Sequence, residues 1–245
     1  DPCPTGKGVD GGQIEDSAVI AYRLARLINC PVVATGEEDY VSDGTRVFAV
    51  PHGHPIMTAV TGTGCLLGAV LAAFFSAYYP CKNRLSIGEF LGYALAYYGL
   101  AGESAVQVSG VQPGSFSVAF MDSLYTLDDA VLMSENRIRP IVVPDQLQVY
   151  FISGTQDVEL NENRLLSIVE DACRGGVTCF QFREKGAGTL VGQQKLELAQ
   201  QLKQICAKYN VLYVINDDVD LAMAVNADGV HVGQEDMRLE EVRNL

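Results

Sequence analysis

A glycine-rich turn that ends in a cysteine is the first feature of this 245-residue chain that could do chemistry. The turn, Thr61-Gly62-Thr63-Gly64-Cys65, directly precedes a long apolar segment. Glycines allow a tight turn, and the free N–H groups of a helix start form an anion site that suits the terminal phosphate of a nucleotide. Cys65 would stand where the helix dipole favours a thiolate, which can act as base toward a substrate alcohol. These residues alone leave a simpler interpretation open, in which the turn is only a turn and Cys65 is a small core residue.

Three clusters of polar and charged residues follow three successive predicted strands in the second half of the chain. In a parallel α/β barrel the chemistry lies at the C-terminal ends of the strands. Arg183 and Lys185 would neutralise phosphate oxygens, and Asp217 and Asp236 would supply hard oxygen ligands for Mg²⁺. The pattern therefore predicts a diphosphate–magnesium site, although charged residues also occur in loops without any function. The clusters are residues 181–185, 216–218 and 233–236.

The apolar pattern of the first half predicts helices and short strands around the glycine-rich turn. The most apolar segment, 66–79, is shorter than the roughly 20 residues of a membrane-spanning helix, so it is expected to be a buried helix. The predicted elements are a helix over 14–28, a short buried strand over 31–35, a hairpin over 40–51 that turns at Asp43-Gly44, and helices over 66–79, 86–108 and 116–125.

Residues 126–148 lose this periodicity, contain Pro140 and Pro144, and are the best candidate for a linker. After them, strands alternate regularly with helices. Four strand–helix units predict a parallel sheet with right-handed crossovers, and continuation of the pattern would give an eight-stranded barrel. The predicted strands are 149–153, 178–182, 211–216 and 229–233, and the helices are 162–173, 190–209, 219–225 and one that begins after Asp236.

Composition narrows the class of protein further. The net charge of −13, with only 17 basic residues, argues against a nucleic-acid binder or a protein that binds anionic membranes. A phosphate ligand must then be held by a few placed groups and a metal ion. Seven widely spaced cysteines without a Cys-x-x-Cys pair, and no signal peptide, fit a reducing cytoplasm. The chain begins at Asp1 and stops within a predicted helix, so we expect a fragment at both ends.

The first half resembles hydroxyethylthiazole kinase of the ribokinase-like superfamily. The resemblance implies that Cys65 is the base or the substrate-orienting group and that Gly62 contacts the thiazole alcohol. It also implies that the amides of residues 62 to 65, with Thr63 and Gly64 among them, hold the transferring phosphate. It also implies ATP as co-substrate, with Thr35 on its phosphates. The family's N-terminal part, with its acidic metal-binding segment, is missing. The matching residues are Val33 to Glu37, Asp39 to Val41, Asp43-Gly44, Met57-Thr58, Val60 to Cys65, Pro113 to Phe116 and Phe120 to Asp122.

The second half resembles thiamine phosphate synthase. The resemblance implies that residues 181–185 and Asn216 bind the pyrimidine diphosphate, while Asp217 and Asp236 hold Mg²⁺. Pyrophosphate would then leave, and the thiazole nitrogen would attack the pyrimidine methylene. The barrel half that binds thiazole phosphate in the family is missing. The matching residues are Gly175 to Thr178, Gln181, Arg183 to Lys185, Asn216-Asp217, Asp220 to Ala222 and Ala227 to Asp236, and the diphosphate-binding set is Gln181, Phe182, Arg183, Glu184, Lys185 and Asn216.

Three further residues of the second half receive a structural or an open interpretation. His231 either lines the pyrimidine pocket or is a satisfied core histidine. Asp220 and Asp228 are expected to be structural, as a helix-start acid and a turn residue.

The predicted fold class is α/β, with a ribokinase-like fragment over 1–140 followed by the first half of a TIM (β/α)₈ barrel over 141–245. The predicted function is a bifunctional thiamine-salvage transferase. Its partners would be the four small-molecule substrates, namely hydroxyethylthiazole, ATP, hydroxymethylpyrimidine diphosphate and thiazole phosphate, with no nucleic acid and no membrane. We also expect a homo-oligomer. Two alternatives stay open: a pyrimidine kinase-like first half, and a truncated remnant without catalysis.

Overall fold

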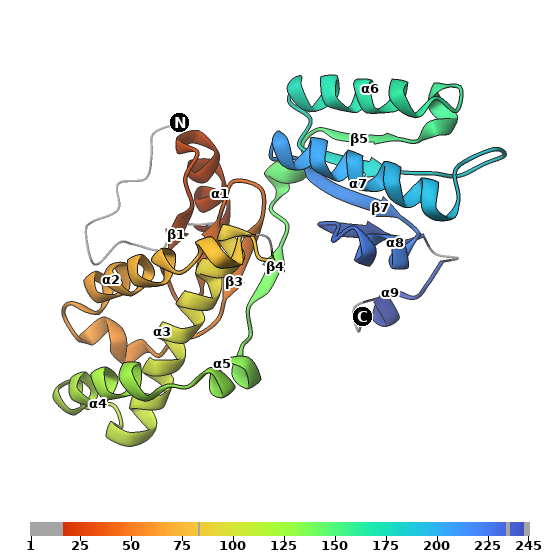
Figure 1. Cartoon of the computed structure of the whole chain (residues 1–245). Helices are drawn as coiled ribbons and strands as arrows, with labels where there is room; N and C mark the ends of the chain where they lie inside the picture. The colour runs from red at the N-terminus through yellow and green to blue at the C-terminus, as the bar shows by residue number, and fades with distance from the viewer. Residues whose placement is uncertain (1–16, 83, 234–235, 243–245) are drawn as a thin grey trace. The chain divides into compact units, whose positions relative to one another are not determined.

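The computed structural model describes residues 17–82, 84–233 and 236–242, apart from three side chains in the short helical segments 79–81 and 239–242. The chain divides into two compact units, residues 1–142 and 143–245, coloured in sequence order in Figure 1. Each unit has its own sheet and its own hydrophobic core. Among the described residues, no helix has both the length and the apolar character needed to cross a membrane.

The first unit contains an antiparallel sheet in the order β1-β2-β3-β4. α1 packs on β1 and β2, and α3 packs on β2 and β3, so β3 is buried along its whole length. The elements are α1 (Ser17–Ile28), β1 (Val32–Ala34), β2 (Asp39–Ser42), β3 (Val47–Val50), η2 (Pro55–Ala59), α2 (Thr63–Ser76), η3 (Tyr79–Cys81), α3 (Ile87–Ser109), α4 (Pro113–Thr126), α5 (Asp129–Glu135) and β4 (Arg139–Ile141).

Local chemistry explains the bounds of these elements. The predicted β2–β3 hairpin is confirmed, and Asp43 Oδ1 accepts hydrogen bonds from the amides of Thr45 and Arg46 at its turn. The Ser86 hydroxyl caps the start of α3 by accepting from the Glu89 amide at 3.1 Å. Pro113 opens α4 at a position where its missing N–H costs nothing.

The predicted linker over 126–148 is wrong in its first part. α5 and β4 lie within it, and β4 pairs with β3, so these residues belong to the first unit. Pro140 is tolerated because β4 is an edge strand with one neighbour, where the missing N–H breaks no second ladder. The strand predicted to be buried, β1, is half-buried for a similar reason, since it is the other edge of the sheet.

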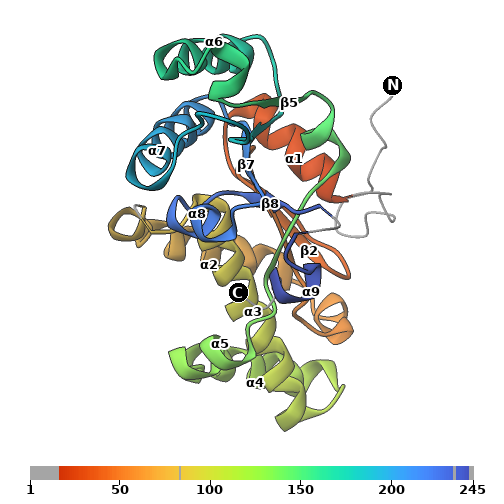
Figure 2. The ribbon, with the colours of Figure 1, turned by 90° about the vertical axis from the view of Figure 1, so that its right-hand side faces the viewer.

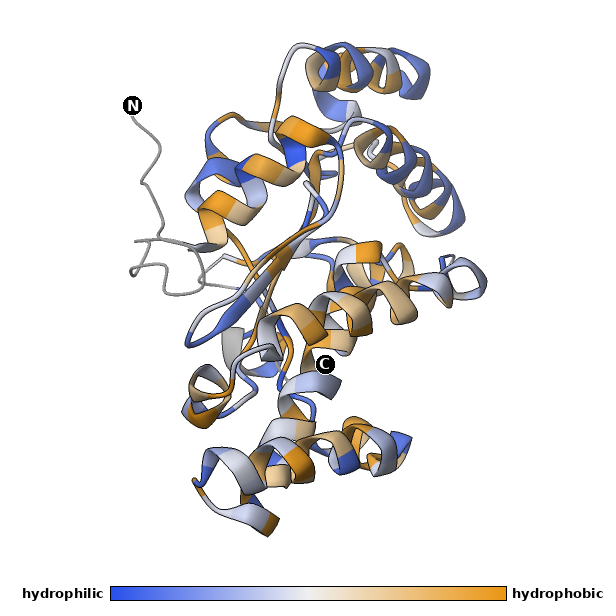
Figure 3. Cartoon of the chain, turned by 90° about the vertical axis from the view of Figure 1, so that its left-hand side faces the viewer, coloured by the Kyte–Doolittle hydropathy of each residue, from blue (hydrophilic) through white to orange (hydrophobic). Residues whose placement is uncertain are grey.

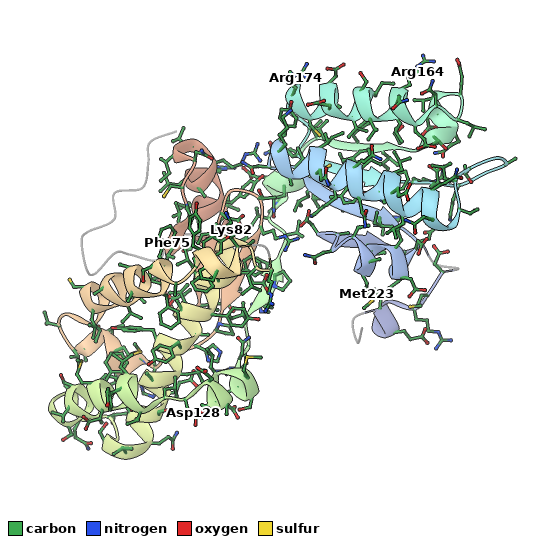
Figure 4. The ribbon with its side chains drawn as sticks, in the orientation of Figure 1. Phe75, Lys82, Asp128, Arg164, Arg174 and Met223 are labelled. Atoms are coloured by element: carbon green, nitrogen blue, oxygen red, sulfur yellow. The ribbon has the colours of Figure 1, made fainter. Side chains whose placement is uncertain are left out.

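The prediction that the most apolar segment is a buried helix is also wrong. Figure 3 shows the apolar colouring of α2, yet Leu67 is its only buried residue in the structure of residues 63–76. Phe75, labelled in Figure 4, is 54% exposed. Among the described elements, α3 makes the main contact with α2 and covers only part of its surface. Apolar composition indicated the helix correctly but did not reveal how many neighbours it has.

The second unit contains the predicted parallel sheet, in the order β5-β6-β7-β8 (Figures 1 and 2). Each strand is followed by a helical segment, as the alternating pattern predicted. The elements are β5 (Tyr150–Ser153), η5 (Thr155–Val158), α6 (Glu162–Arg174), β6 (Cys179–Phe182), α7 (Gly192–Lys208), β7 (Leu212–Asn216), α8 (Val219–Ala224), β8 (Gly229–His231) and α9 (Leu239–Val242), preceded by the single turn η4 (Pro144–Leu147).

The core of this unit lies between the sheet and helices α6 and α7. Phe180, Phe182, Tyr213 and Ile215 alternate along β6 and β7 and pack on the buried faces of the two helices. The charged side of α6 points away from the sheet, as the labelled Arg164 and Arg174 show in Figure 4. The residues between them on each strand therefore face the other side of the sheet.

Asp228 is structural, as predicted. Its Oδ2 accepts from the Tyr213 amide and from Lys203 Nζ, both at 2.9 Å. The carboxylate thereby ties the turn before β8 to β7 and to α7.

Two helical glycines provide a test of the packing in the first unit. A Cβ on Gly99 of α3 would lie 2.7 Å from the His52 carbonyl carbon and 2.9 Å from the Gly53 nitrogen, both backbone atoms. A Cβ on Gly68 of α2 would meet open space. We expect Gly99→Ala to lower the free energy of unfolding by roughly 1–3 kcal/mol through this clash. Gly68→Ala should raise it by up to about 1 kcal/mol, because alanine favours the helix. Urea unfolding of both variants measures this, and equal shifts would contradict the packing.

Candidate active sites

The turn before α2 has the geometry that its glycines predicted. Gly62 adopts a left-handed conformation with φ of 100°, and its carbonyl accepts the first helical hydrogen bond from the Leu66 amide at 2.8 Å. The Thr63 hydroxyl donates to the carbonyls of Met57 and Val60, at 2.8 and 3.0 Å. These bonds fasten the start of α2 to the η2 turn.

Thr63 is one of the residues predicted to hold the transferring phosphate. Both the hydroxyl and the amide of Thr63 already donate to backbone carbonyls of the preceding turn. Thr63 therefore organises the turn, and its contact with a phosphate stays a prediction.

The amides of Gly64 and Cys65 do remain available. Neither has an acceptor among the described residues. A Cβ on Gly62 or Gly64 would meet nothing within 4 Å, so the space beside the backbone is open. Cys65 is exposed in the first turn of α2, next to these amides. The predicted anion site therefore consists of two free N–H groups and an accessible thiol.

Tyr98 supports this turn, a role that was not predicted from the sequence. Its hydroxyl donates to the Thr63 carbonyl at 2.5 Å, and burial raises its pKa to about 12. Its ring packs edge-on against Phe120, with centroids 5.0 Å apart. The only sequence signal was helical spacing with Leu91 and Leu95, which marks a core position and not a contact with the turn.

Thr35 lies directly after β1 and is exposed. The loop that follows it is held by Asp39, whose Oδ1 accepts from the Gly36 amide at 2.9 Å. Burial raises the pKa of Asp39 to about 6, although the Gly36 hydrogen bond opposes the shift. In the described part of the chain no hydrogen bond joins Thr35 to the Gly62 turn, so its contact with ATP stays a prediction.

The second site lies at the C-terminal ends of β6, β7 and β8. Asp217 follows β7 with a positive φ of 62°, and its amide donates to the His231 carbonyl at 2.7 Å. Its carboxylate forms an ion pair with Lys185, which follows β6. Partial burial acts to raise the pKa of Asp217, but hydrogen bonds with Lys185 and Asp236 outweigh it and leave the pKa lowered. The structure thus brings together one residue from each of the three predicted clusters.

The carboxylates of this site fit a magnesium ion. Asp217 Oδ2 is buried and forms the ion pair with Lys185 Nζ. Asp236 Oδ2 accepts from the Gly233 amide at 2.7 Å, and the Asp236 side chain also contacts Asp217. No group of three or more acidic, histidine or cysteine side chains in the described part could hold a metal. Two carboxylates suit Mg²⁺, which keeps waters and binds substrate phosphates.

The predicted residues of β6 and its loop separate into two kinds. Gln181 lies on the sheet face opposite the helices, where its Nε2 donates to the Tyr150 hydroxyl at 3.1 Å. Arg183 and Lys185 are exposed beyond the strand end. The Phe182 side chain, by contrast, is 1% exposed and packs in the core under the helices. Its predicted contact with the diphosphate is therefore wrong for the side chain, because strand alternation points it away.

Glu184 is also not free to bind a ligand. Its two oxygens accept hydrogen bonds from the Thr155 amide at 2.9 Å, from the Thr155 hydroxyl, and from the Leu190 amide at 3.0 Å. A carboxylate with three donors and a negative charge is a poor contact for a diphosphate. Its place at the strand end, which it shares with its neighbours, is its only signal in the sequence.

At the end of β7, Asn216 is half-buried and stands in register with His231 of β8. His231 is exposed, so of its two interpretations the core histidine is wrong. Asp218 is structural: it caps α8 through the Leu221 amide at 3.0 Å and pairs with Lys195 Nζ at 2.7 Å.

Two known protein families match different parts of this chain. The model of the hydroxyethylthiazole kinase family matches residues 4–130, just over half of the 245 residues. The model of thiamine monophosphate synthase matches residues 149–245. The chain belongs to the hydroxyethylthiazole kinase family, and a region similar to the synthase family follows its kinase region. The comparisons confirm that both resemblances occur in one chain.

Individual proteins are similar to one or both of these regions. The thiamine biosynthesis bifunctional protein ThiM/ThiE of Symbiobacterium thermophilum is 35% identical over 244 residues, which cover 97% of this chain and 48% of the relative. Thiamine-phosphate synthase 1 of Streptococcus pneumoniae is 54% identical over 99 residues, 40% of this chain and 46% of that protein. The solved hydroxyethylthiazole kinase of Pyrococcus horikoshii OT3 aligns at 34% identity and a TM-score of 0.47, over 52% of this chain and 47% of that one. The chain spans about half the length of the curated relatives it matches.

The raised pKa of Asp39 generates a test of pH dependence. Because its folded-state pKa of about 6 lies above the ordinary value of 3.8, the folded chain binds this proton more tightly than the unfolded chain. Stability should therefore rise as the pH falls from 7 to 5, by about 1 kcal/mol from this group. Asp39→Asn keeps an acceptor for the Gly36 amide but does not titrate, so the difference between the two unfolding free energies should change over this interval. A difference that is constant from pH 7 to 5 would contradict the assignment.

Proposed function

We propose that this chain serves thiamine biosynthesis through two transferase reactions. Its kinase-like region, residues 1–140, phosphorylates hydroxyethylthiazole with ATP. Its synthase-like region, residues 141–245, condenses hydroxymethylpyrimidine diphosphate with the resulting thiazole phosphate and releases pyrophosphate. The product of the first reaction is a substrate of the second, which gives a reason for joining the two regions in one chain.

In the kinase-like region, the start of α2 supports phosphoryl transfer. The free amides of Gly64 and Cys65 would donate to the transferring phosphoryl group and stabilise its charge. The Cys65 thiol is accessible beside them and would accept the proton of the thiazole alcohol as its oxygen attacks. Gly62 has no side chain to block the alcohol, and Thr35 would contact ATP.

In the synthase-like region, the strand ends support departure of a diphosphate. Arg183 and Lys185 would bind its oxygens, and Asn216 and Gln181 would orient the pyrimidine. Asp217 and Asp236 would hold Mg²⁺, which when bound neutralises charge on the leaving pyrophosphate. The pyrimidine methylene left behind is electrophilic, and the thiazole nitrogen forms the new C–N bond to it.

One observation carries this proposal. Lys185, Asp217 and Asp236 come from three separate strand ends and meet at one mouth of the sheet. A cation and two carboxylates in contact form a site that a magnesium diphosphate would complete.

The match lengths support a finer assignment of the two regions. We infer that residues 1–140 correspond to the C-terminal part of a kinase domain and residues 141–245 to the N-terminal part of a barrel synthase. Location in the cytoplasm and assembly into a homo-oligomer stay predictions.

Two single variants should separate the two reactions in the protein expressed from its complete reading frame. We expect Cys65→Ala to lower kcat for thiazole phosphorylation on the order of 100-fold, because the base is lost, while the synthase rate stays unchanged. Asp217→Ala should lower the synthase rate on the order of 100-fold, because a metal ligand is lost, while the kinase rate stays unchanged. Steady-state assays of both reactions on both variants measure this.

Three outcomes would contradict the proposal. Equal residual rates in wild type and both variants would favour a remnant without catalysis. Phosphorylation of the pyrimidine alcohol alone would instead favour a pyrimidine kinase. A variant that lowers both rates together would show that the two regions do not act as separate sites.

A further inference from the structure

We propose that Glu184 and Thr155 form a clamp that positions Arg183 and Lys185 for diphosphate binding, so that Glu184 is a positioning residue and not a ligand. The inference rests on the proposed synthase function of the second unit. It assigns a role to the segment Gly154-Thr155-Gln156 after β5, which the sequence analysis did not single out.

Next to this clamp, the end of β5 holds the backbone of Arg183. Its amide donates to the Ser153 carbonyl at 3.0 Å, and its carbonyl accepts from Gln156 Nε2 at 2.7 Å. A Cβ on Gly154 would overlap that carbonyl oxygen, so only glycine permits the approach. The peptide that starts the basic loop is therefore fixed from both sides by the end of β5.

The clamp formed by Glu184 and Thr155 holds the two ends of the loop together. Glu184 accepts from both the amide and the hydroxyl of Thr155, which is 1% exposed, and from the Leu190 amide on the far side of the loop. Gly186 and Gly188, inside the loop, have φ values of 124° and 79°, and glycines add backbone freedom. The Glu184 carboxylate thus closes a loop that its own sequence would leave free.

The charges at the strand end are consistent with a positioning role for Glu184 and an anion-binding role for Arg183 and Lys185. The Arg183 side chain forms no ion pair among the described residues, and Lys185 pairs with Asp217. Glu184 lies between them in sequence, yet its acceptors are directed at Thr155 and Leu190. The clamp keeps the one negative side chain of this segment away from the anion and leaves the two cations at the strand end.

The direction in which Glu184→Gln changes the affinity for diphosphate separates a clamp from simple electrostatics. Glu184→Gln removes a negative charge beside the anion site, so electrostatics alone would tighten diphosphate binding. The clamp predicts the opposite, because one amide N–H₂ would then face donors of Thr155 or Leu190 and the tether would loosen.

Thr155→Val and Thr155→Ser form a matched pair with Glu184→Gln. Valine removes the hydroxyl donor, and serine keeps it. The variants are measured in the protein from the complete reading frame. We expect Thr155→Val and Glu184→Gln to raise the KM for the pyrimidine diphosphate roughly tenfold, while kcat changes less than about threefold. The reason is that the binding energy is lost equally from the ground state and the transition state. Thr155→Ser should restore nearly wild-type values. The Kd of inorganic pyrophosphate with Mg²⁺, measured by calorimetry, should follow KM, and thermal unfolding checks that each variant is folded.

Lys185→Ala distinguishes failure of the clamp from failure of the site. If Lys185→Ala weakens pyrophosphate binding while Glu184→Gln leaves it unchanged or tighter, the clamp is overturned and the proposed function stands. If Thr155→Ser loses as much affinity as Thr155→Val, packing and not the hydroxyl is responsible, which also overturns the clamp. If Lys185→Ala and Asp217→Ala both leave binding unchanged, the site itself is wrong and the inference falls with it.

Discussion

Each phosphate group that this chain is proposed to bind must be attracted against a net charge of −13. An overall positive field is not available, so attraction has to come from groups placed within hydrogen-bond reach. The first unit offers backbone amides at the start of α2, which carry partial positive charge without adding a basic residue. The second unit offers Arg183 and Lys185 beside carboxylates that fit a metal ion. Because of this net charge, phosphate binding at both sites depends on the backbone path that places these groups.

A single left-handed residue sets that path in each unit. Gly62, with φ of 100°, turns the chain so that the amides of the first helical turn of α2 are free, and Tyr98 and Thr63 hold the turn against α3 and η2. Asp217, with φ of 62°, turns the chain after β7 and brings its carboxylate to Lys185. A non-glycine residue in this region is uncommon, and its amide is held by the His231 carbonyl at the end of β8.

Periodicity in the sequence was sufficient to predict the second unit. Strands and helices alternate there with clear apolar patterns, and the parallel order β5-β6-β7-β8 follows from them. The first unit was harder, because whether α2 is buried depends on how many elements pack on it, and no local pattern records that number. α5 and β4 were missed because a short helix and an edge strand with Pro140 leave little periodic signal.

The sequence predicted which residues lie at the strand ends, but not where their side chains point. The positions of Lys185, Asp217 and Asp236 followed from their place after β6, β7 and β8. The direction of each side chain did not: Phe182 points into the core, and Glu184 is taken by Thr155, a residue almost thirty positions away in sequence. Contacts of this kind depend on the close approach at Gly154 and have no signature at the strand end itself.

The most direct test of the account is the coupled reaction in the protein from its complete reading frame. Hydroxyethylthiazole, ATP, hydroxymethylpyrimidine diphosphate and Mg²⁺ would be supplied together, and thiamine phosphate measured by its oxidation to a fluorescent product. We expect thiamine phosphate to form, to disappear when ATP is omitted, and to return when thiazole phosphate replaces hydroxyethylthiazole and ATP. Failure to form thiamine phosphate even from thiazole phosphate, or formation that needs a separately added kinase, would contradict the claim that one chain carries both reactions.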